Sequence, residues 1–214
     1  MKLILLAPPG AGKGTQAERI AKDYAVKHTS TGDLLREAVD KATPHGLEAE
    51  KYMKKGELVP NEVVIDIMKN KLKEMDGFIL DGFPRTLKQA KMLDEILKRE
   101  KKPLDGVIEI HVSNREVIER ITGRLSCKCG EIYHEKYNPP AAEGICDKCG
   151  GKLYKREDDR EETVLSRLKT YKKKTLPLVK YYFKKGILHT VNGEQEIEDV
   201  YKEIKKVLDK IKKN

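Results

Sequence analysis

A glycine-rich stretch with a single lysine, residues 7–15 (APPGAGKGT), has the residue types and spacing of a phosphate-binding loop. It follows the apolar run Leu3–Leu6 and leads into a segment of helical pattern from Thr15. In such a turn consecutive backbone N–H groups point inward, and the N-terminus of the following helix adds partial positive charge. Lys13 would reach the outer phosphates of a di- or triphosphate, with a hydroxyl near a bound metal ion. We therefore predict a nucleotide-binding loop rather than a plain Gly/Pro turn.

The segment Phe78–Arg85 (FILDGFPR) is a second candidate phosphate-binding element. Its apolar run ends in Asp81, where a P-loop fold places the carboxylate that organises Mg²⁺ and its waters. Gly82 allows the backbone to approach a ligand, and Arg85 presents a planar guanidinium suited to phosphate. An Asp-Gly pair after a strand is on its own more often a turn, but beside a phosphate-binding loop the functional interpretation is favoured.

The four cysteines form two close pairs, Cys127-x-Cys129 and Cys146-x-x-Cys149, separated by sixteen residues. A glycine directly follows each pair, as in zinc knuckles, where it lets backbone N–H groups turn toward sulfur. Clustered cysteines in a cytosolic chain favour a tetrahedral Zn²⁺ site over two disulfides or free thiols. We expect one structural Zn²⁺ ion with no open coordination position.

Hydrophobic patterning alternates between strands and helices, which predicts an α/β P-loop fold with a parallel five-stranded sheet flanked by helices. The expected strands are residues 2–6, 28–29, 78–80, 107–112 and 187–191. The expected helices are residues 15–24, 32–41, 61–74, 87–100, 114–122 and 161–185, with a last helix from Ile197.

Two segments interrupt this alternation. Residues 30–59 are helical in pattern and have no strand, and residues 126–160 contain all four cysteines and Pro139-Pro140. We expect both to be inserts on one core domain, which would consist of residues 1–29, 60–125 and 161–214.

Charge and hydropathy narrow the classes of partner. The 214 residues carry a net charge of +9, which fits an anionic partner, either polyphosphate nucleotides or nucleic acid. The opening apolar run is too short to span a membrane, and Lys13 interrupts it too early for a secretory signal. We therefore predict a cytoplasmic protein without a membrane partner.

Five short motifs follow one another along the chain: residues 10–15 (GAGKGT), 30–36 (STGDLLR), 55–60 (KGELVP), 81–85 (DGFPR) and 158–163 (DDREET). They occur in the order seen in adenylate kinases, and over essentially its whole length the chain resembles the long form of that family. The resemblance implies Mg²⁺-dependent, reversible conversion of ATP and AMP into two ADP by a monomer that binds no nucleic acid. It also implies that residues 30–59 are an AMP-binding insert and residues 126–160 a zinc-binding lid.

The resemblance also implies the residues on the ATP side and around the transferred phosphoryl group. That transfer requires alignment, exclusion of water and neutralised charge, and no strong base. The catalytic residues would be Lys13, Asp81, Arg85, Arg124, Arg156 and Arg167. The ATP-binding residues would be Gly10, Ala11, Gly12, Lys13, Gly14, Thr15, Arg120, Arg124, Ile132, Tyr133 and Gln195.

An AMP site follows from the same resemblance. Gln89 has the amide pair needed to donate to and accept from the adenine edge, although an ordinary surface glutamine is the alternative. Asp158 and Asp159 are expected to orient lid arginines rather than to touch substrate. The AMP-binding residues would be Thr31, Arg36, Met53, Glu57, Leu58, Val59, Gly82, Arg85, Gln89, Arg156 and Arg167.

The chain departs from the family pattern at three places. Ala7 replaces the first glycine of the phosphate-binding loop, and Leu125 stands where the family often has a second arginine after Arg124. The first cysteine pair is one residue shorter than the usual C-x-x-C, which leaves His134 as an alternative ligand to Cys129.

Closure of the lid over ATP would bring Arg124 and Arg156 onto the phosphates and exclude water. A zinc-ribbon nucleic-acid-binding protein is one alternative, but it leaves the motif at residues 81–85 unexplained, and the cysteine segment lacks interleaved aromatics. A nucleoside monophosphate kinase with another acceptor base, or with GTP as donor, is the second. Thr31 and Gln89 favour AMP.

Overall fold

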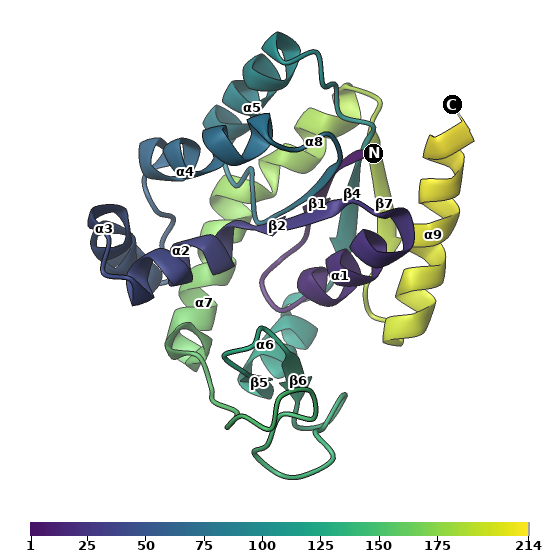
Figure 1. Ribbon diagram of the computed structural model, residues 1–214. Helices are drawn as coiled ribbons and strands as arrows, with labels where there is room; N and C mark the ends of the chain where they lie inside the picture. The colour runs from purple at the N-terminus through teal and green to yellow at the C-terminus, as the bar shows by residue number, and fades with distance from the viewer. Residues whose placement is uncertain (214) are drawn as a thin grey trace.

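The computed structural model describes residues 1–213, with the exception of the Asn70 side chain. Its centre is a five-stranded parallel sheet in the order β2-β3-β1-β4-β7 (Figure 1). The predicted P-loop α/β fold is confirmed, and each strand end lies within one residue of its predicted position. The strands are β1 (Lys2–Leu6), β2 (Lys27–Ser30), β3 (Phe78–Asp81), β4 (Gly106–His111) and β7 (Leu188–Asn192).

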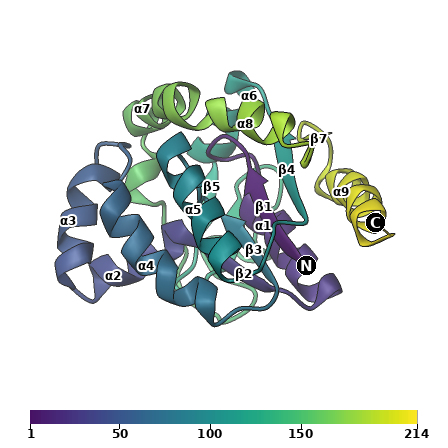
Figure 2. The ribbon, with the colours of Figure 1, turned by 90° about the horizontal axis from the view of Figure 1, so that it is seen from above.

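Both faces of the sheet are covered by helices (Figures 1 and 2), which explains why the central strands are continuous apolar runs. Ile4 and Leu6 of β1 pack on one face, whereas Leu3 and Leu5 pack on the other, as the alternation of a strand requires. The first layer contains α4 (Asn61–Lys73), α5 (Leu87–Arg99) and α8 (Pro177–Lys184). The second contains α1 (Lys13–Tyr24), α6 (Asn114–Thr122), α7 (Glu161–Thr170) and α9 (Ile197–Lys213).

Parallel pairing places the carboxyl ends of β1 and β3 at one edge of the sheet. Leu5 pairs with Asp81, so residues 7–12 and Asp81 leave the sheet side by side. Ligands of open α/β sheets bind at this edge, outside the carboxyl ends of the strands.

The helix predicted for residues 161–185 is wrong in one respect, because it is interrupted. A π-helical turn, Tyr171–Thr175, separates α7 from α8, and the backbone N–H of Leu176 donates to the carbonyl of Tyr171. Pro177 follows, and it lacks the N–H that a continuous α-helix needs at this position. No helix within residues 1–213 is both long enough and apolar enough to cross a lipid bilayer.

The 30–59 segment contains two packed helices, α2 (Thr31–Asp40) and α3 (Pro44–Met53). The second helix was not located from the pattern, although Thr43-Pro44 is a start signal: the Thr43 hydroxyl accepts a hydrogen bond from the Gly46 N–H at 3.0 Å. A Cβ at Gly46 would lie 2.0 Å from the carbonyl oxygen of Ala38, so glycine permits the close approach of α2 and α3.

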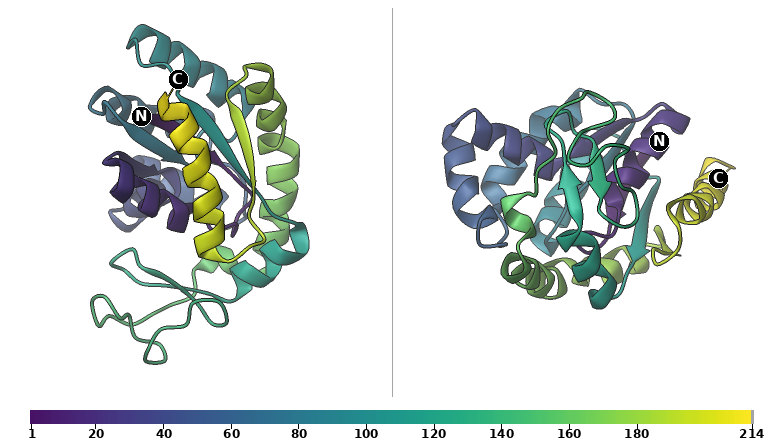
Figure 3. Two further views of the ribbon diagram at one scale, coloured as in Figure 1. Left: turned by 90° about the vertical axis from the view of Figure 1, so that its right-hand side faces the viewer. Right: turned by 90° about the horizontal axis from the view of Figure 1, so that it is seen from below.

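The 126–160 segment projects from the body of the molecule beyond α6 (Figure 3). It is entered through the antiparallel pair β5 (Arg124–Ser126) and β6 (Ile132–His134), and it ends in a 3-10 turn, Glu157–Asp159. Its small apolar core consists of Cys127, Tyr133, Cys146 and Leu153, with Leu125 packed against them. A core of this size stabilises little on its own, so a metal ion or covalent link is expected to hold the segment together.

Candidate functional site

The phosphate-binding loop runs from the end of β1 to the first residue of α1, which is Lys13, two residues earlier than predicted. Gly10 and Gly12 have φ values of +74° and +78°, and a Cβ at Gly10 would lie 2.3 Å from the Ile121 side chain. The Lys13 ammonium folds back over the loop and donates to the carbonyls of Ala7 and Pro8 at 3.2 and 3.1 Å. The backbone carbonyl of residue 7 therefore contacts Lys13 even though this residue is alanine rather than the glycine of the family pattern.

One cavity of about 460 Å³ gathers the predicted site residues. The residues that line it come from the phosphate-binding loop, the segments 30–59 and 126–160, and the ends of β3, α6 and α7. Every residue predicted for ATP, AMP or the transferred phosphoryl group lines this cavity: Gly10, Ala11, Gly12, Lys13, Gly14, Thr15, Thr31, Arg36, Met53, Glu57, Leu58, Val59, Asp81, Gly82, Arg85, Gln89, Arg120, Arg124, Ile132, Tyr133, Arg156, Arg167 and Gln195.

Asp81 is the buried carboxylate at the floor of the cavity. Burial alone would raise its pKa, but His28, whose Nε2 lies 3.5 Å from Oδ2, together with Lys13 and Arg85 holds the pKa below its usual value. Burial lowers the pKa of Lys13 to about 8, which Asp81 opposes and Arg85 reinforces. Asp81 is therefore ionised and able to organise a hydrated cation. His28 was missed in the sequence, because it meets Asp81 only through the pairing of β2 with β3.

Arg85 is fixed by the backbone around it. Its Nε donates to the Gly82 carbonyl at 2.8 Å, its own N–H donates to Gln89 Oε1 at 2.6 Å, and its carbonyl accepts from Thr175 Oγ1 at 2.9 Å. Gly82 has φ +78°, and a Cβ there would lie 2.8 Å from Thr31 Oγ1 and 2.9 Å from Arg85 Nη2. Gln89 is only 2% exposed, so the alternative of an ordinary surface glutamine is excluded.

Two neighbouring aspartates, Asp158 and Asp159, hold Arg124 and Arg167. Arg124 makes a two-point contact with Asp159, and Arg167 Nη1 lies 3.1 Å from carboxylate oxygens of both Asp158 and Asp159. Burial alone would lower the pKa of Arg124, but Asp159 raises it above its ordinary value. The expectation that these two aspartates orient arginines agrees with these contacts.

On the side where ATP is predicted, two hydrogen bonds hold the Arg120 side chain. Its Nε donates to Glu116 and its Nη1 donates to the Gly193 carbonyl, each at 2.8 Å. Gln195 Nε2 donates to Glu203 at 2.9 Å and to the Asn192 carbonyl at 3.2 Å. These contacts orient both polar side chains at the same end of the cavity.

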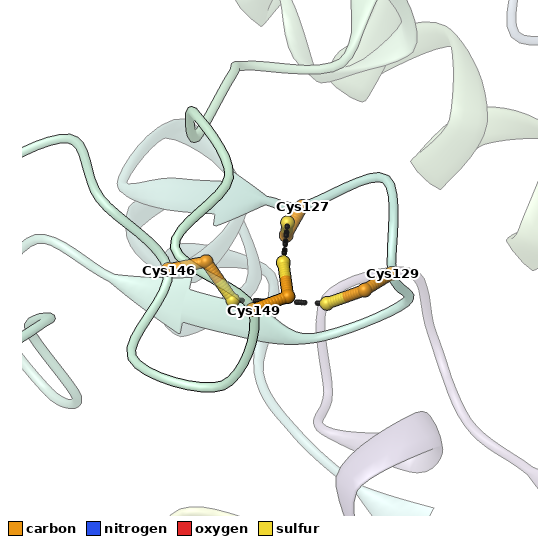
Figure 4. Close-up of side chains that lie close together, drawn as sticks. All are labelled: Cys127, Cys129, Cys146 and Cys149. Carbon is orange, nitrogen blue, oxygen red and sulfur yellow. Dashed lines mark hydrogen bonds between the residues drawn. The ribbon is translucent and has the colours of Figure 1, made fainter.

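The four cysteine sulfurs point toward one another (Figure 4), and all lie within 4.8 Å of each other. Cys127 and Cys149 have Sγ atoms 3.4 Å apart, and those of Cys129 and Cys146 are 3.7 Å apart, with no disulfide among them. Four Zn–S bonds of about 2.3 Å place tetrahedral sulfurs ~3.8 Å apart, so the donor set fits this ion. The shortened first pair thus brings Cys129 into the cluster.

His134 is directed away from the sulfurs. Its Nδ1 accepts hydrogen bonds from the backbone N–H groups of Lys136 and Tyr137 at 3.0 and 3.1 Å, and its Nε2 lies 3.4 Å from the Glu119 carbonyl. These contacts exclude it as the alternative ligand in this arrangement.

Comparison with known proteins agrees with the geometry. The family model described as adenylate kinase matches residues 5–187. An adenylate kinase of Archaeoglobus fulgidus is 56% identical over 99% of this chain and 100% of its own length. The adenylate kinase of Bacillus subtilis is 54% identical over the whole of both chains. That of Methanosarcina barkeri is 53% identical over 98% of this chain and 99% of its own length. The chain belongs to the adenylate kinase family.

Proposed function

We propose that the cavity transfers the terminal phosphoryl group of ATP to AMP, reversibly, to give two ADP. The supporting observation is that a lysine-bearing phosphate loop and six arginines from separate parts of the chain converge on one cavity. Six arginines and a lysine facing the same space repel one another, and a highly charged anion relieves that repulsion. A pair of nucleotides with phosphates placed end to end has this charge.

The ATP phosphates would lie in the loop of residues 10–15, where backbone N–H groups and Lys13 surround them. Arg120 would stack on the adenine, with Ile132, Tyr133 and Gln195 beside it. Lys13 leaves the Ala7 and Pro8 carbonyls to reach the phosphates.

The acceptor would lie between α2, the 57–59 backbone and Arg85. Arg36 and Arg85 would clamp its phosphate in two-point contacts. Thr31 and Met53 would line the adenosine pocket, and Gln89 would contact the adenine edge.

Transfer itself requires the two phosphates in line and the charge on the moving group neutralised. Arg85, Arg124, Arg156 and Arg167 would supply that charge. We infer that residues 126–160 act as a lid and residues 30–59 as an AMP-binding insert on a core of residues 1–29, 60–125 and 161–214. Closure of both would exclude water before transfer.

Two metal ions fit the residues present. When bound, Mg²⁺ would neutralise charge on the phosphates, and Asp81 and Thr15 would hold it through water or directly. Zn²⁺ would be held by Cys127, Cys129, Cys146 and Cys149 as a structural ion. We propose that the enzyme is cytoplasmic, because its substrates are intracellular nucleotides and free thiols persist in a reducing compartment. The family resemblance further implies a monomer.

A coupled assay of ADP formation tests the proposal. With Mg·ATP as donor, we expect turnover with AMP and at least ~100-fold lower kcat/KM with GMP, CMP or UMP, because a buried amide left unpaired by the wrong base is costly. Preference for another monophosphate would retain the transfer mechanism and overturn the acceptor assignment. Absence of turnover in metal-replete protein, with salt-sensitive RNA binding, would support the nucleic-acid alternative instead.

The pKa of Lys13 predicts how ATP binding depends on pH. In the free protein the pKa of Lys13 is about 8. A bound triphosphate raises this pKa, so at a pH above 8 ATP binding is accompanied by protonation of Lys13. The charged lysine binds phosphate, and its population falls as pH rises through 8. The Kd for ATP is therefore expected to weaken about tenfold between pH 7 and pH 9.

Binding of AMP alone provides the matched control, measured by calorimetry in the same buffers. Its phosphate is assigned to Arg36 and Arg85, which stay charged over this range, and is itself fully ionised. Its Kd should change less than twofold. A flat profile for ATP, or a parallel decline for AMP, would contradict the assignment of Lys13.

A further inference from the structure

Arg156 is held differently from most of the arginines that line the cavity. Arg36, Arg124 and Arg167 each form an ion pair with an aspartate. Arg156 has no carboxylate within ion-pair distance in the part of the chain described, residues 1–213. Its Nε instead donates to the hydroxyl of Ser126 at 2.8 Å.

A neutral partner suits a cation that must bind phosphate. A carboxylate in direct contact would cancel much of the charge of Arg156, whereas a hydroxyl fixes the guanidinium without adding negative charge. Of its five N–H donors one is used by Ser126, so the Nη1 and Nη2 groups remain for a two-point contact with phosphate oxygens.

The surroundings of Arg156 make such an anchor necessary. Burial, together with repulsion from Arg36 and Arg124, lowers its pKa to about 10, although Asp33 and Asp159 oppose this shift. A long side chain among like charges would otherwise move away from them, out of the cavity.

Ser126 is itself placed rigidly. It is 1% exposed, and it exchanges two backbone hydrogen bonds with Tyr154, at 2.8 and 2.9 Å. It lies at the end of β5, opposite Ile132, and directly before Cys127 of the sulfur cluster. The hydroxyl therefore has a fixed position relative to the cavity.

The residue before Ser126 in β5 makes neutralisation of the transferred phosphoryl group depend more on Arg156. Leu125, at the position of the family's second arginine, packs into the small core of the cysteine segment. This strand therefore contributes one cation, Arg124, and that side chain is already bonded to Asp159.

We propose that Ser126 is a positioning residue for phosphoryl transfer, which holds Arg156 with its two terminal nitrogens facing the transferred group. The proposal rests on the function proposed above and adds a residue that does not itself line the cavity. Since the contact acts on the arrangement of charge during transfer, it affects kcat more than nucleotide binding.

Ser126→Ala removes the hydroxyl with a small loss of volume. We expect kcat for ADP formation to fall about tenfold, the effect of losing one hydrogen bond to a charged group. KM for ATP and AMP should change less than twofold. Ser126→Thr and Ser126→Val form a matched pair of equal shape, and the threonine variant should retain several times more activity than the valine variant.

The decisive measurement is a double-mutant cycle with Arg156→Ala. If Ser126 acts through Arg156, then Ser126→Ala should cause no further loss of kcat in the Arg156→Ala background. A full tenfold loss in that background, or equal rates for the threonine and valine variants, would overturn the proposal.

Two further measurements separate a positioning role of Ser126 from a purely structural role and from failure of the proposed function. Metal content and the thermal midpoint of Ser126→Ala should match those of the wild type, and a loss of either would assign the residue a merely structural role. Wild-type protein without ADP formation would refute the proposed function itself, whereas an active wild type with an unaffected Ser126→Ala variant refutes only the role of Ser126.

Discussion

Replacement of Arg85 by lysine should lower kcat for ADP formation by about a thousandfold, the magnitude typical of an arginine that neutralises a transferred phosphoryl group. Arg85 is half-buried, and its Nε is engaged by the Gly82 carbonyl at 2.8 Å, so its remaining donors face the cavity in one orientation. Lysine preserves the charge but has neither the planar fork nor the fixed orientation. Initial rates in a coupled assay at saturating Mg·ATP and AMP measure the change.

Arg19→Lys is the matched control. Arg19 is one-third exposed on α1 and pairs with Glu198 of α9, so the same substitution there should change kcat by less than twofold. The thermal midpoint of Arg85→Lys should be nearly unchanged, since lysine keeps the charge and most of the aliphatic stem of the side chain. A loss of kcat smaller than tenfold would remove Arg85 from the transfer step.

The sequence predicted those parts of the fold in which local pattern and burial agree. Residues 3–6 are apolar without interruption because β1 lies at the centre of the sheet with helices on both faces. The spacing of glycines around Lys13 likewise admits few backbone conformations, and the loop has the predicted character.

Departures from the prediction occur where a tertiary contact competes with local pattern. Residues 161–185 have an uninterrupted helical pattern, yet a π-turn lies within them, where the Thr175 hydroxyl donates to the Arg85 carbonyl at 2.9 Å. Pro177 was the visible signal for a break. The location of α3 was hidden by Gly46, which reads as a helix breaker but is required for contact with α2.

Candidate site residues were predicted by motif, whereas their supporting contacts were not. His28 with Asp81, and Ser126 with Arg156, join residues 53 and 30 positions apart in the chain. Such pairs cannot be predicted from sequence spacing. They depend on which strands are neighbours in the sheet and on which residues meet where a long segment rejoins the core. The resemblance named the residues that face substrate, and only the fold reveals the residues that hold them in place.

Replacement of Cys146 by serine should abolish metal binding and lower the thermal midpoint by about 10 °C. Cys146 is 1% exposed at the centre of a core of four buried side chains, which is too small to hold residues 126–160 together without a metal ion or a covalent link. Loss of a structural metal removes several kcal/mol, and each ~1 kcal/mol corresponds to ~2–4 °C for a chain of this size. Metal analysis of the purified protein and calorimetric melting measure the two effects.

Lys128→Ser is the control, because it alters the exposed residue between Cys127 and Cys129 and leaves every sulfur in place. It should retain about one metal ion per chain and the wild-type midpoint. Treatment of the wild type with a strong chelator should reproduce the melting behaviour of Cys146→Ser, since both remove the same link. If the purified protein contains no metal and its mass falls by the four hydrogens that two disulfides release, then oxidised cysteines hold the segment instead. In that case a reductant would lower the midpoint and a chelator would not, and this difference identifies which link stabilises the segment that positions Arg124 and Arg156.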